Sequence, residues 1–236
     1  MAPVLLSKED HKELKIQTAR SEEMGDIVSY CMVVPHEFRD VQHHYPIFFR
    51  KLPDQDVFLP MALLGLEPNE NLFIANGQWQ CRYIPLIMAV QPFVIGRADE
   101  NSDEGRVFID EESPRIAKNA NEGVRIFDDF GNETSFMQGI VGGLETLHQG
   151  DQAARAMSEW LEKYDLLESF ALEVELKDGS RNRLLGFHTI NEKKMAELEE
   201  AACMEMVEKG YMMPIHMILA SLASISDLIE LKNQRM

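Results

Sequence analysis

The sequence predicts an α+β protein in which an antiparallel sheet with hairpins is covered by helices, mainly from the C-terminal half. Two changes of pattern carry this prediction. Residues 27–127 contain short runs of apolar and β-branched residues separated by turn residues, which is typical of strands and hairpins. From residue 133 onward, apolar residues recur with the period of a helix. We expect the sheet to come largely from residues 27–127, with helices over 133–167 and 190–232 packed on it.

The first elements of this sheet are expected over residues 27–59. Residues 27–34 read IVSYCMVV and predict a buried strand that ends at Pro35. Proline suits the first turn of a helix, so we expect a helix over residues 35–45. A strand is expected at residues 47–49 and a loop over 51–59.

The dipeptide Asn76-Gly77 is the strongest local structural signal in the chain. It stands between two short apolar runs, and both residues accept the positive φ of a type I′ turn. We therefore expect a hairpin with a two-residue loop. On its second strand Trp79 and Tyr83 share a face, and we expect Trp79 to face the core.

Further strands are expected at residues 93–95, 106–109 and 124–127, with a short helix at 85–90. The helices of the C-terminal half begin at residue 133, and we expect Gly150 to end the first of them.

A second hairpin is predicted over residues 170–188, where apolar and acidic residues alternate. Thr189 and Glu192 fit a capping box that opens a helix ending at Gly210. We expect one domain over 1–236, sheet-rich over 1–132 and helix-rich over 133–236.

The last helix, over residues 211–232, is apolar around much of its girth. Met213 and Met217 lie outside the stripe that would face a single neighbour. One interpretation is that the helix lies centrally within the fold. The other is that its methionines contact a partner protein or a second copy of the chain, because methionine side chains adapt well to a partner surface.

The charge of the chain argues against nucleic-acid partners. Forty acidic residues against 23 basic ones give a net charge of −17, which repels phosphates and anionic lipid surfaces. Solubility explains this charge, and a basic partner surface is the alternative explanation.

The sequence predicts a cytoplasmic protein. The three cysteines, Cys31, Cys81 and Cys203, are widely spaced, and no two of them form a CxxC motif. This odd number of widely spaced cysteines fits a reducing compartment. The apolar run at residues 3–6 is too short for a secretory signal. The longest apolar stretch, 83–96, is interrupted by polar residues and prolines, so we expect no membrane span, which needs about 20 apolar residues.

Four residues are candidates for a small-molecule pocket: Glu37, Trp79, Arg82 and Tyr83. Aromatic rings with a few convergent polar groups are typical of such pockets. The alternative is that Trp79 and Tyr83 are core residues of a hairpin.

His36, Asp40 and His44 stand four residues apart, so a continuous helix would place them on one face. Two histidines and a carboxylate are the ligand set of non-haem iron sites. The alternative is a polar outer face, and it is the reading that we follow. We expect no cofactor and no resident metal.

The chain resembles the SapC-like family of soluble bacterial proteins over most of its length. The resemblance rests on Pro35-x-Glu37-Phe38, Tyr45-Pro46-Ile47-Phe48, Leu64-Gly65-Leu66, Glu70-Asn71-Leu72-Phe73, Gly77-x-Trp79, Tyr83-Ile84-Pro85, Pro92-Phe93, Ile109-Asp110-Glu111 and Ile126-Phe127-Asp128 before Gly131, and on a C-terminal hairpin, an Ile-Asn-Glu helix entry, Gly210 and a final apolar helix with Ser221 and Ser224.

The resemblance implies a role beside a modifying enzyme, because such proteins are often encoded near tryptophan-halogenase-like flavoproteins. It implies no catalytic residues. We therefore expect a non-enzymatic accessory or binding protein that associates with a protein partner or with itself. The alternative is a metal-dependent oxygenase of the non-haem iron type, or another small-molecule enzyme.

Overall fold

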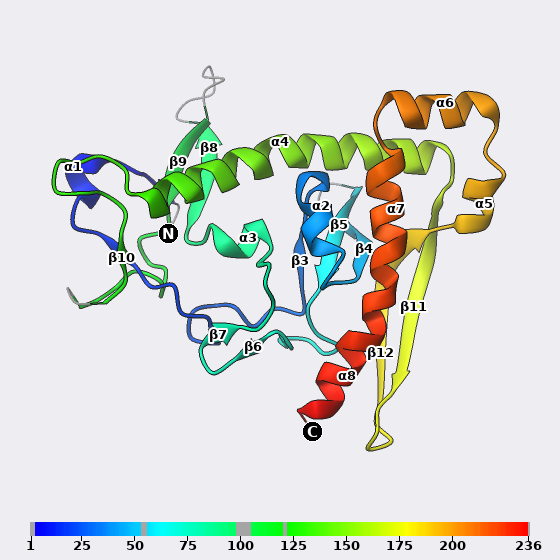
Figure 1. Ribbon diagram of the computed structural model, residues 1–236, viewed down its shortest axis with the longest axis horizontal. Helices are drawn as coiled ribbons and strands as arrows, with labels where there is room; N and C mark the ends of the chain where they lie inside the picture. Colours follow the sequence, from blue (N-terminus) through cyan, green and yellow to red (C-terminus); the bar gives the residue numbers. More distant parts are fainter. Residues whose placement is uncertain (1–2, 53–55, 98–104, 120–121, 236) are drawn as a thin grey trace. The chain divides into compact units, whose positions relative to one another are not determined.

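The computed structural model confirms the α+β class and divides the chain into two compact units (Figure 1). It describes residues 3–52, 56–97, 105–119 and 122–235. Unit 1 is formed by Met1–Asp26, Ile74–Gln80 and Leu86–Gln149, and unit 2 by Ile27–Phe73, Cys81–Pro85 and Gly150–Met236.

The described part of unit 1 contains three small antiparallel sheets, two short helices and residues 135–149 of the long helix α4 (Ser135–Lys163). The three-stranded sheet has the order β1-β9-β8, and the two-stranded sheets pair β10 with β2 and β6 with β7. The predicted strands near residues 93, 106 and 124 and the helix near 86 are confirmed. The elements are β1 (Val4–Leu5), α1 (Lys8–His11), β2 (Lys15–Ile16), β6 (Ile74–Ala75), β7 (Gln78–Trp79), α3 (Leu86–Ala89), β8 (Phe93–Arg97), β9 (Gly105–Ile109) and β10 (Val124–Arg125).

The hairpin of β6 and β7 confirms the predicted two-residue turn. Ala75 pairs with Gln78, and the two loop residues have φ values of +53° at Asn76 and +72° at Gly77. Both values are positive, as a type I′ turn requires. Trp79 is half-buried, so its indole ring covers the surface of unit 1 and does not lie inside the core as expected.

An ion cluster inside unit 1 fixes three distant segments to one another. The Asp26 carboxylate has no exposed surface and accepts a hydrogen bond from Arg20 at 3.1 Å and another from Arg115. Arg20 also donates to the carbonyl oxygen of Met88 at 2.8 Å. A buried ion is tolerated only with such partners, so this cluster specifies how the segments meet.

Helix α4 (Ser135–Lys163) runs without a break through Gly150, contrary to the prediction that this glycine ends a helix. The reason is close packing. A Cβ atom at position 150 would lie 2.5 Å from Cβ of Val34, which is fully buried. Gly150 therefore lets the helix approach Val34 closely, and the helix propensity of the neighbouring residues carries the helix across one glycine.

Unit 2 is built on a five-stranded antiparallel sheet with the order β11-β12-β4-β5-β3. Three of its strands lie within residues 27–127, as expected, and the C-terminal hairpin supplies the other two. β12 joins by pairing Phe187 with Arg50 and His188 with Phe49. The strands are β3 (Tyr30–Met32), β4 (Ile47–Leu52), β5 (Val57–Leu63), β11 (Leu167–Glu175) and β12 (Arg181–Ile190).

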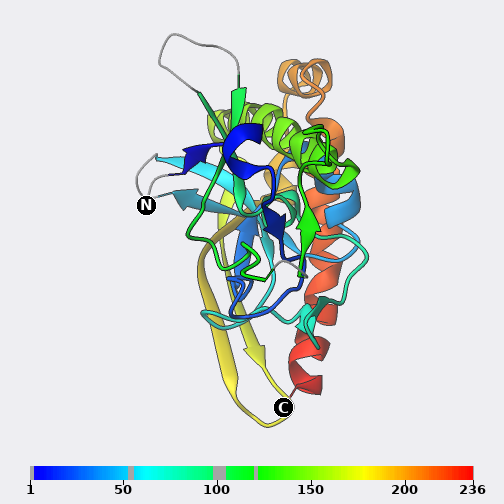
Figure 2. The same cartoon turned by 90° about the vertical axis from the view of Figure 1, so that its left-hand side faces the viewer.

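The loop expected over residues 51–59 is largely strand. β4 continues through Leu52, and β5 begins at Val57 opposite it, with residues 53–55 outside the described part of the chain. The hairpin predicted over 170–188 is confirmed and longer than expected (Figure 2). A register shift between Phe170 and Leu172, next to Gly186 with φ +82°, bends it where it leaves β4.

The C-terminal helices are shorter than predicted and more numerous. Asn191, not Thr189, caps α5, because its side chain accepts a hydrogen bond from the Lys194 amide. The single helix expected to end at Gly210 is interrupted at residues 197–199. Gly210, with φ +72°, ends its second part as predicted. The C-terminal helices are α5 (Glu192–Ala196), α6 (Glu200–Glu208), α7 (Met212–Ser221), η2 (Leu222–Ser224) and α8 (Ile225–Gln234).

The helix expected over residues 35–45 is divided and shorter. It consists of η1 (Pro35–Glu37) and α2 (Phe38–Val41).

Helix α7 packs against β4 and β12 along one stripe. Ile215 and Ile218 are fully buried in this stripe, and Ser221 accepts a hydrogen bond from the Ile47 amide at 2.8 Å. Near the end of α8, Lys232 pairs with Glu70 at 2.6 Å. Helices α7 and α8 are therefore fixed to unit 2 by a buried stripe and polar contacts, and α7 also packs against α2.

Candidate functional site

Glu37 and Tyr83, two of the four predicted pocket residues, are joined in unit 2. The Tyr83 hydroxyl donates to Oε2 of Glu37 at 2.8 Å, and the Val34 amide donates to Oε1 at 3.1 Å. Glu37 is only 3% exposed although it is a carboxylate. The Tyr45 hydroxyl donates to the carbonyl oxygen of Tyr83 at 2.5 Å, which fixes the tyrosine segment.

Burial and the Glu37 carboxylate keep the Tyr83 hydroxyl and the Cys31 thiol protonated. Burial, with the adjacent Glu37 carboxylate, raises the pKa of Tyr83 far above its ordinary range. Burial, again with Glu37, raises the pKa of the Cys31 thiol well above its usual value. A thiol that stays protonated is a poor nucleophile, so the cluster suits a hydrogen-bonded core better than nucleophilic chemistry.

The other two predicted pocket residues belong to different units. Arg82 is exposed on unit 2 beside Tyr83 in the sequence. Trp79 is half-buried on β7 and belongs to unit 1. Two of the four pocket candidates, Glu37 and Tyr83, are therefore in direct contact, and a small-molecule pocket lined by all four stays a prediction.

The alternative metal ligands do not lie on one continuous helix. His36 is in η1 and Asp40 is in α2, which ends at Val41, so His44 follows the helix. His36 and Asp40 are exposed, whereas burial lowers the pKa of His44. In the part of the chain that the structure describes, no three His, Cys, Asp or Glu side chains are grouped as metal ligands.

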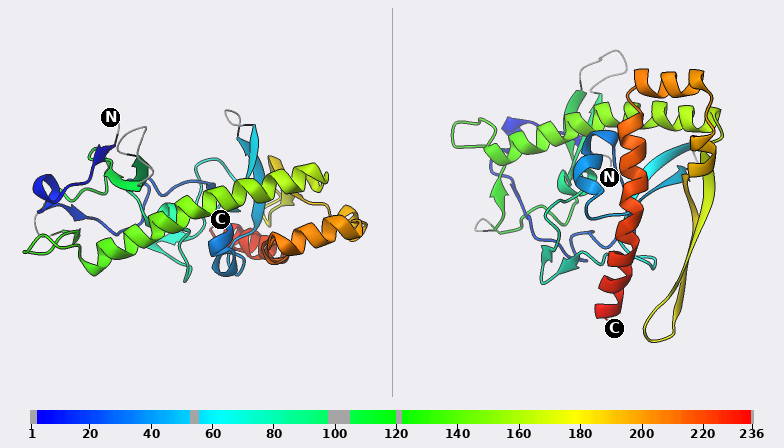
Figure 3. Two further views of the ribbon diagram at one scale, coloured as in Figure 1. Left: turned by 90° about the horizontal axis from the view of Figure 1, so that it is seen from above. Right: turned by 45° about the vertical axis from the view of Figure 1, so that its right-hand side comes forward.

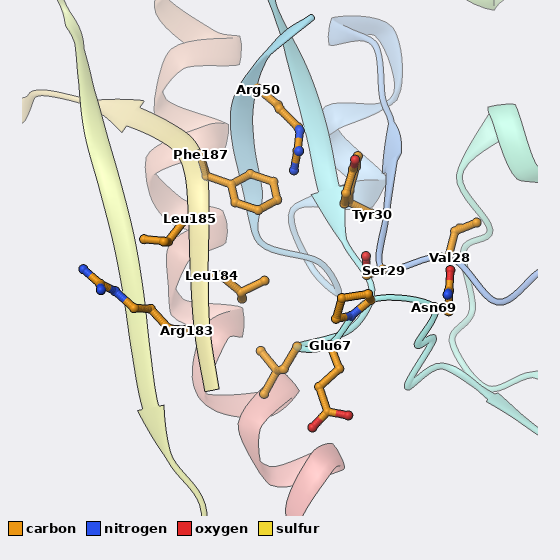
Figure 4. Close-up of a pocket in the computed structure, with 12 residues that line it drawn as sticks. Val28, Ser29, Tyr30, Arg50, Glu67, Asn69, Arg183, Leu184, Leu185 and Phe187 are labelled. Carbon is orange, nitrogen blue, oxygen red and sulfur yellow. The ribbon is translucent and has the colours of Figure 1, made fainter. Parts of the chain in front are cut away.

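A cleft in unit 2, which the sequence did not reveal, is organised around Arg50. It has a volume of about 560 Å³. The guanidinium carbon of Arg50 lies 4.7 Å from the ring centroid of Tyr30 and 5.3 Å from that of Phe187. Figure 4 shows the Arg50 side chain directed between these two rings. Two aromatic faces thus hold a cation at the wall of an open cleft.

The elements that bring these three residues together explain why the sequence did not predict the cleft. Phe187 on β12 is the register partner of Arg50 on β4, and Tyr30 lies on β3 in the same sheet. Arg50 stands just after the run IFF, where the apolar signal stops. Only the pairing of β12 with β4 brings Phe187 to it, and no local pattern encodes that pairing.

A second feature of unit 2 lies where α6 turns into α7, a turn that Figure 3 shows. Exposed apolar side chains stand on both sides of this turn. We call the surface that they form the methionine surface and define it by Met204, Val207, Met212 and Met213. These side chains are between 45% and 56% exposed. Exposed apolar groups that gather in a short segment indicate an interaction site more often than single ones do.

Met212–Gln234 is the one helical stretch of the described residues that is long and apolar enough to cross a membrane, by length and composition alone. Within its most apolar window, 28% of the residues are buried in the fold. The stretch also carries Asp227, Glu230 and Lys232, and Lys232 is paired with Glu70. It gives no clear membrane span.

Comparison with known proteins identifies the family but no individual relative. No curated protein matches the chain, and no solved structure matches it. The family model described as SapC matches residues 6–228 of the 236, which includes nearly all of both units. The resemblance noted in the sequence is thereby confirmed, and the chain belongs to the SapC family.

Proposed function

We propose that this protein is a non-enzymatic accessory protein that binds a partner protein through the methionine surface. The observation that carries the proposal is the exposure of four large apolar side chains at the junction of α6 and α7. Methionine supplies a flexible, polarisable contact that adapts to a partner. Association with a modifying enzyme, which the family resemblance implies, would use such a surface.

The acidic charges on the α6 side of this surface favour a basic partner over a second copy of the chain, whereas on the α7 side the Arg39 guanidinium donates to the sulfur of Met213 at 3.1 Å. Glu200 and Glu208 stand four residues before and after Met204 on α6, so they flank it on the same helix face. Both are exposed, and neither has an ion pair with a described residue. Two copies meeting at this face would bring like charges together, whereas a basic rim on a different protein would complement them.

The same proposal places the protein in the cytoplasm. Cys31, Cys81 and Cys203 are all free thiols, which is in keeping with a reducing compartment.

The test is capture of a partner from cells of the native host with the tagged full-length chain. Changing Met204 and Met213 to Asp together should abolish capture of the protein that the wild-type chain enriches, because charges would be buried without partners. The matched control is Phe130→Asp, which changes an apolar side chain that is 91% exposed in unit 1. This control should capture the partner as the wild type does.

Two further results decide the proposal. Raising the salt concentration should weaken capture, and changing Glu200 and Glu208 to Lys should do the same. Equal capture by the methionine variant and the wild type, with both chains folded by circular dichroism, would exclude the methionine surface as the interface.

Metal analysis separates the accessory role from the oxygenase alternative. We predict that the protein purified without chelators holds no stoichiometric iron or zinc, because His36, Asp40 and His44 are not gathered on one helix face. About one metal ion per chain, lost in His36→Ala and in His44→Ala, would instead favour the oxygenase.

A further inference from the structure

Arg50 is a cation whose hydrogen-bond donors remain available in the cleft. Its guanidinium carbon lies over the rings of both Tyr30 and Phe187, which meet nearly edge to face with centroids 5.7 Å apart. Ring faces attract the charge of the guanidinium, and no described residue accepts a hydrogen bond from its five N–H groups. The two rings therefore fix the position of the cation and leave its donors for another group.

The charges of the described cleft residues single out Arg50. No carboxylate of these residues lies within ion-pairing distance of it, in a chain with 40 acidic and 23 basic residues. Arg183 is paired with Glu173 at 3.1 Å. Glu67 is paired with Lys232 at 3.1 Å, which lowers the pKa of Glu67 and keeps it ionised. Arg50 is thus the charge at this cleft that a ligand could neutralise.

The rest of the cleft suits a mostly apolar ligand body. Leu184 and Leu185 line it from β12, Val28 lines it from the segment before β3, and Asn69 adds an amide (Figure 4). Leu185 is 54% exposed although it is apolar. A volume of about 560 Å³ lies within the usual range for small-molecule sites.

We propose that this cleft binds a ligand that carries a carboxylate on an apolar body, and that Arg50 holds the carboxylate through two parallel hydrogen bonds. The planar fork of a guanidinium matches a carboxylate in this way. One unpaired cation balances the single charge of a carboxylate, whereas a phosphate monoester would leave negative charge uncompensated. The inference is independent of the methionine surface.

A carboxylate can come from a free acid or from the C-terminus of a peptide. A peptide has a place to lie, because β12 pairs with β11 over most of its length but with β4 only at Phe187 and His188. Its remaining edge can accept an extended chain. The two sources share the same chemistry at Arg50, and the experiment separates them.

The first experiment titrates the full-length wild-type protein by calorimetry with matched acids and amides. The small pair is 4-phenylbutyrate and 4-phenylbutyramide, and the peptide pair is Ac-Ser-Val-Ser-Val-Phe with a free or an amidated C-terminus. We expect at least one acid to bind saturably, about tenfold or more tightly than its amide. Binding of the small acid indicates a metabolite, and binding of the peptide acid alone indicates a protein C-terminus.

The second experiment repeats the titration with variants that remain folded by circular dichroism. Arg50→Gln should weaken the acid about tenfold or more, and Arg50→Lys should lie between, because lysine keeps the charge but loses the planar fork. The control Arg181→Gln removes an arginine that is 80% exposed, pairs with Glu175 and lies outside the cleft. It should bind like the wild type.

Several outcomes would overturn the proposal. These are equal binding of acid and amide, no saturation by any acid in the millimolar range, tighter binding of phenyl phosphate than of 4-phenylbutyrate, or an Arg50→Gln variant that binds as the wild type does. If Arg50→Gln does not fold, the comparison of acid with amide on the wild-type chain decides alone.

Discussion

The buried carboxylate of Glu37 accepts hydrogen bonds from its own segment and from a tyrosine far along the chain. The Val34 amide fixes one oxygen, and the Tyr83 hydroxyl reaches the other. A buried carboxylate is stable only when its oxygens are satisfied in this way. The pair therefore ties the turn at η1 to the segment that follows β7.

Replacing Tyr83 with Phe tests the value of this contact. The variant should lower the free energy of unfolding by about 1–3 kcal/mol, because a buried acceptor loses a donor while the ring is kept. Chemical denaturation gives this difference directly. The matched control is Tyr211→Phe, since the Tyr211 hydroxyl has no described hydrogen bond and its ring contact with Trp160, at 5.8 Å between centroids, would remain. A control that costs as much as Tyr83→Phe would refute the explanation.

Residue chemistry predicted part of the candidate sites and missed the rest for a physical reason. The sequence placed Glu37 and Tyr83 among four pocket candidates but did not predict that the two form a hydrogen bond with each other. Arg50 could not be recognised, because its environment is made by Tyr30 and Phe187, which reach it through sheet pairing alone. Trp79 was expected in the core, but a two-stranded ribbon buries an aromatic ring only in part.

At the scale of single elements, two glycines of α4 differ in how closely other atoms pack against them. Gly150 is buried with the Val34 side chain where a Cβ would stand, whereas Gly139 is exposed with no atom within 4 Å of that position. The sequence predicts the end of a helix at Gly150 alone, because helix propensity does not report packing. The structure shows that one of the two glycines is required by packing and the other is not.

Changing each glycine to alanine separates packing from helix propensity. Gly139→Ala should raise the free energy of unfolding by about 0.5–1 kcal/mol, because alanine favours the helix. Gly150→Ala should lower it by about 1–3 kcal/mol, because the added methyl group overpacks against Val34. Thermal denaturation of both variants gives the two signs. A stabilising Gly150→Ala would mean that α4 does not approach Val34 closely.

Glu205 joins the end of α4 to α6 through several donors. Hydrogen bonds from Lys163 at 2.9 Å and Tyr164 at 2.7 Å, with Lys209 at 3.0 Å, lower the pKa of Glu205 from 4.5 to about 2. A carboxylate with a lowered pKa stabilises the fold above its unfolded pKa, and this contribution is lost as the pH falls toward the folded value.

The pH dependence of Glu205→Gln follows from this sign. The variant should be less stable than the wild type at neutral pH, and the difference should shrink between about pH 5 and pH 2, where the wild-type carboxylate becomes protonated. Denaturation midpoints across this range measure the effect. Glu208→Gln, on the same helix but without a described ion pair, should show a much smaller difference. A Glu205→Gln difference that grows toward acidic pH would contradict the assignment.

At the scale of the whole molecule, the two units are interleaved along the chain. Each unit is assembled from three separate segments, and α4 contributes residues to both. The change from strand to helix pattern near residue 133 was visible in the sequence, because periodicity is local. The composition of each unit was not visible, because it depends on which distant strands pair.

Because each unit combines distant segments of the chain, we can predict what happens when the chain is cut near residue 133, where the strand pattern changes to a helix pattern. A fragment of residues 1–132 lacks β11, β12 and the whole of α4, and the remaining fragment, 133–236, lacks β3, β4 and β5. Each would expose apolar residues that the five-stranded sheet buries, such as Phe49, Leu59 and Phe187.

We therefore expect neither fragment to unfold cooperatively by circular dichroism or to give a dispersed amide spectrum by NMR. Mixing the two should restore some native signal, because β4 and β12 can pair only when both are present. The full-length chain, treated in the same way, is the reference. A cooperative transition in the 1–132 fragment alone would show that its strands need no C-terminal hairpin, and the five-stranded sheet would then have to be revised.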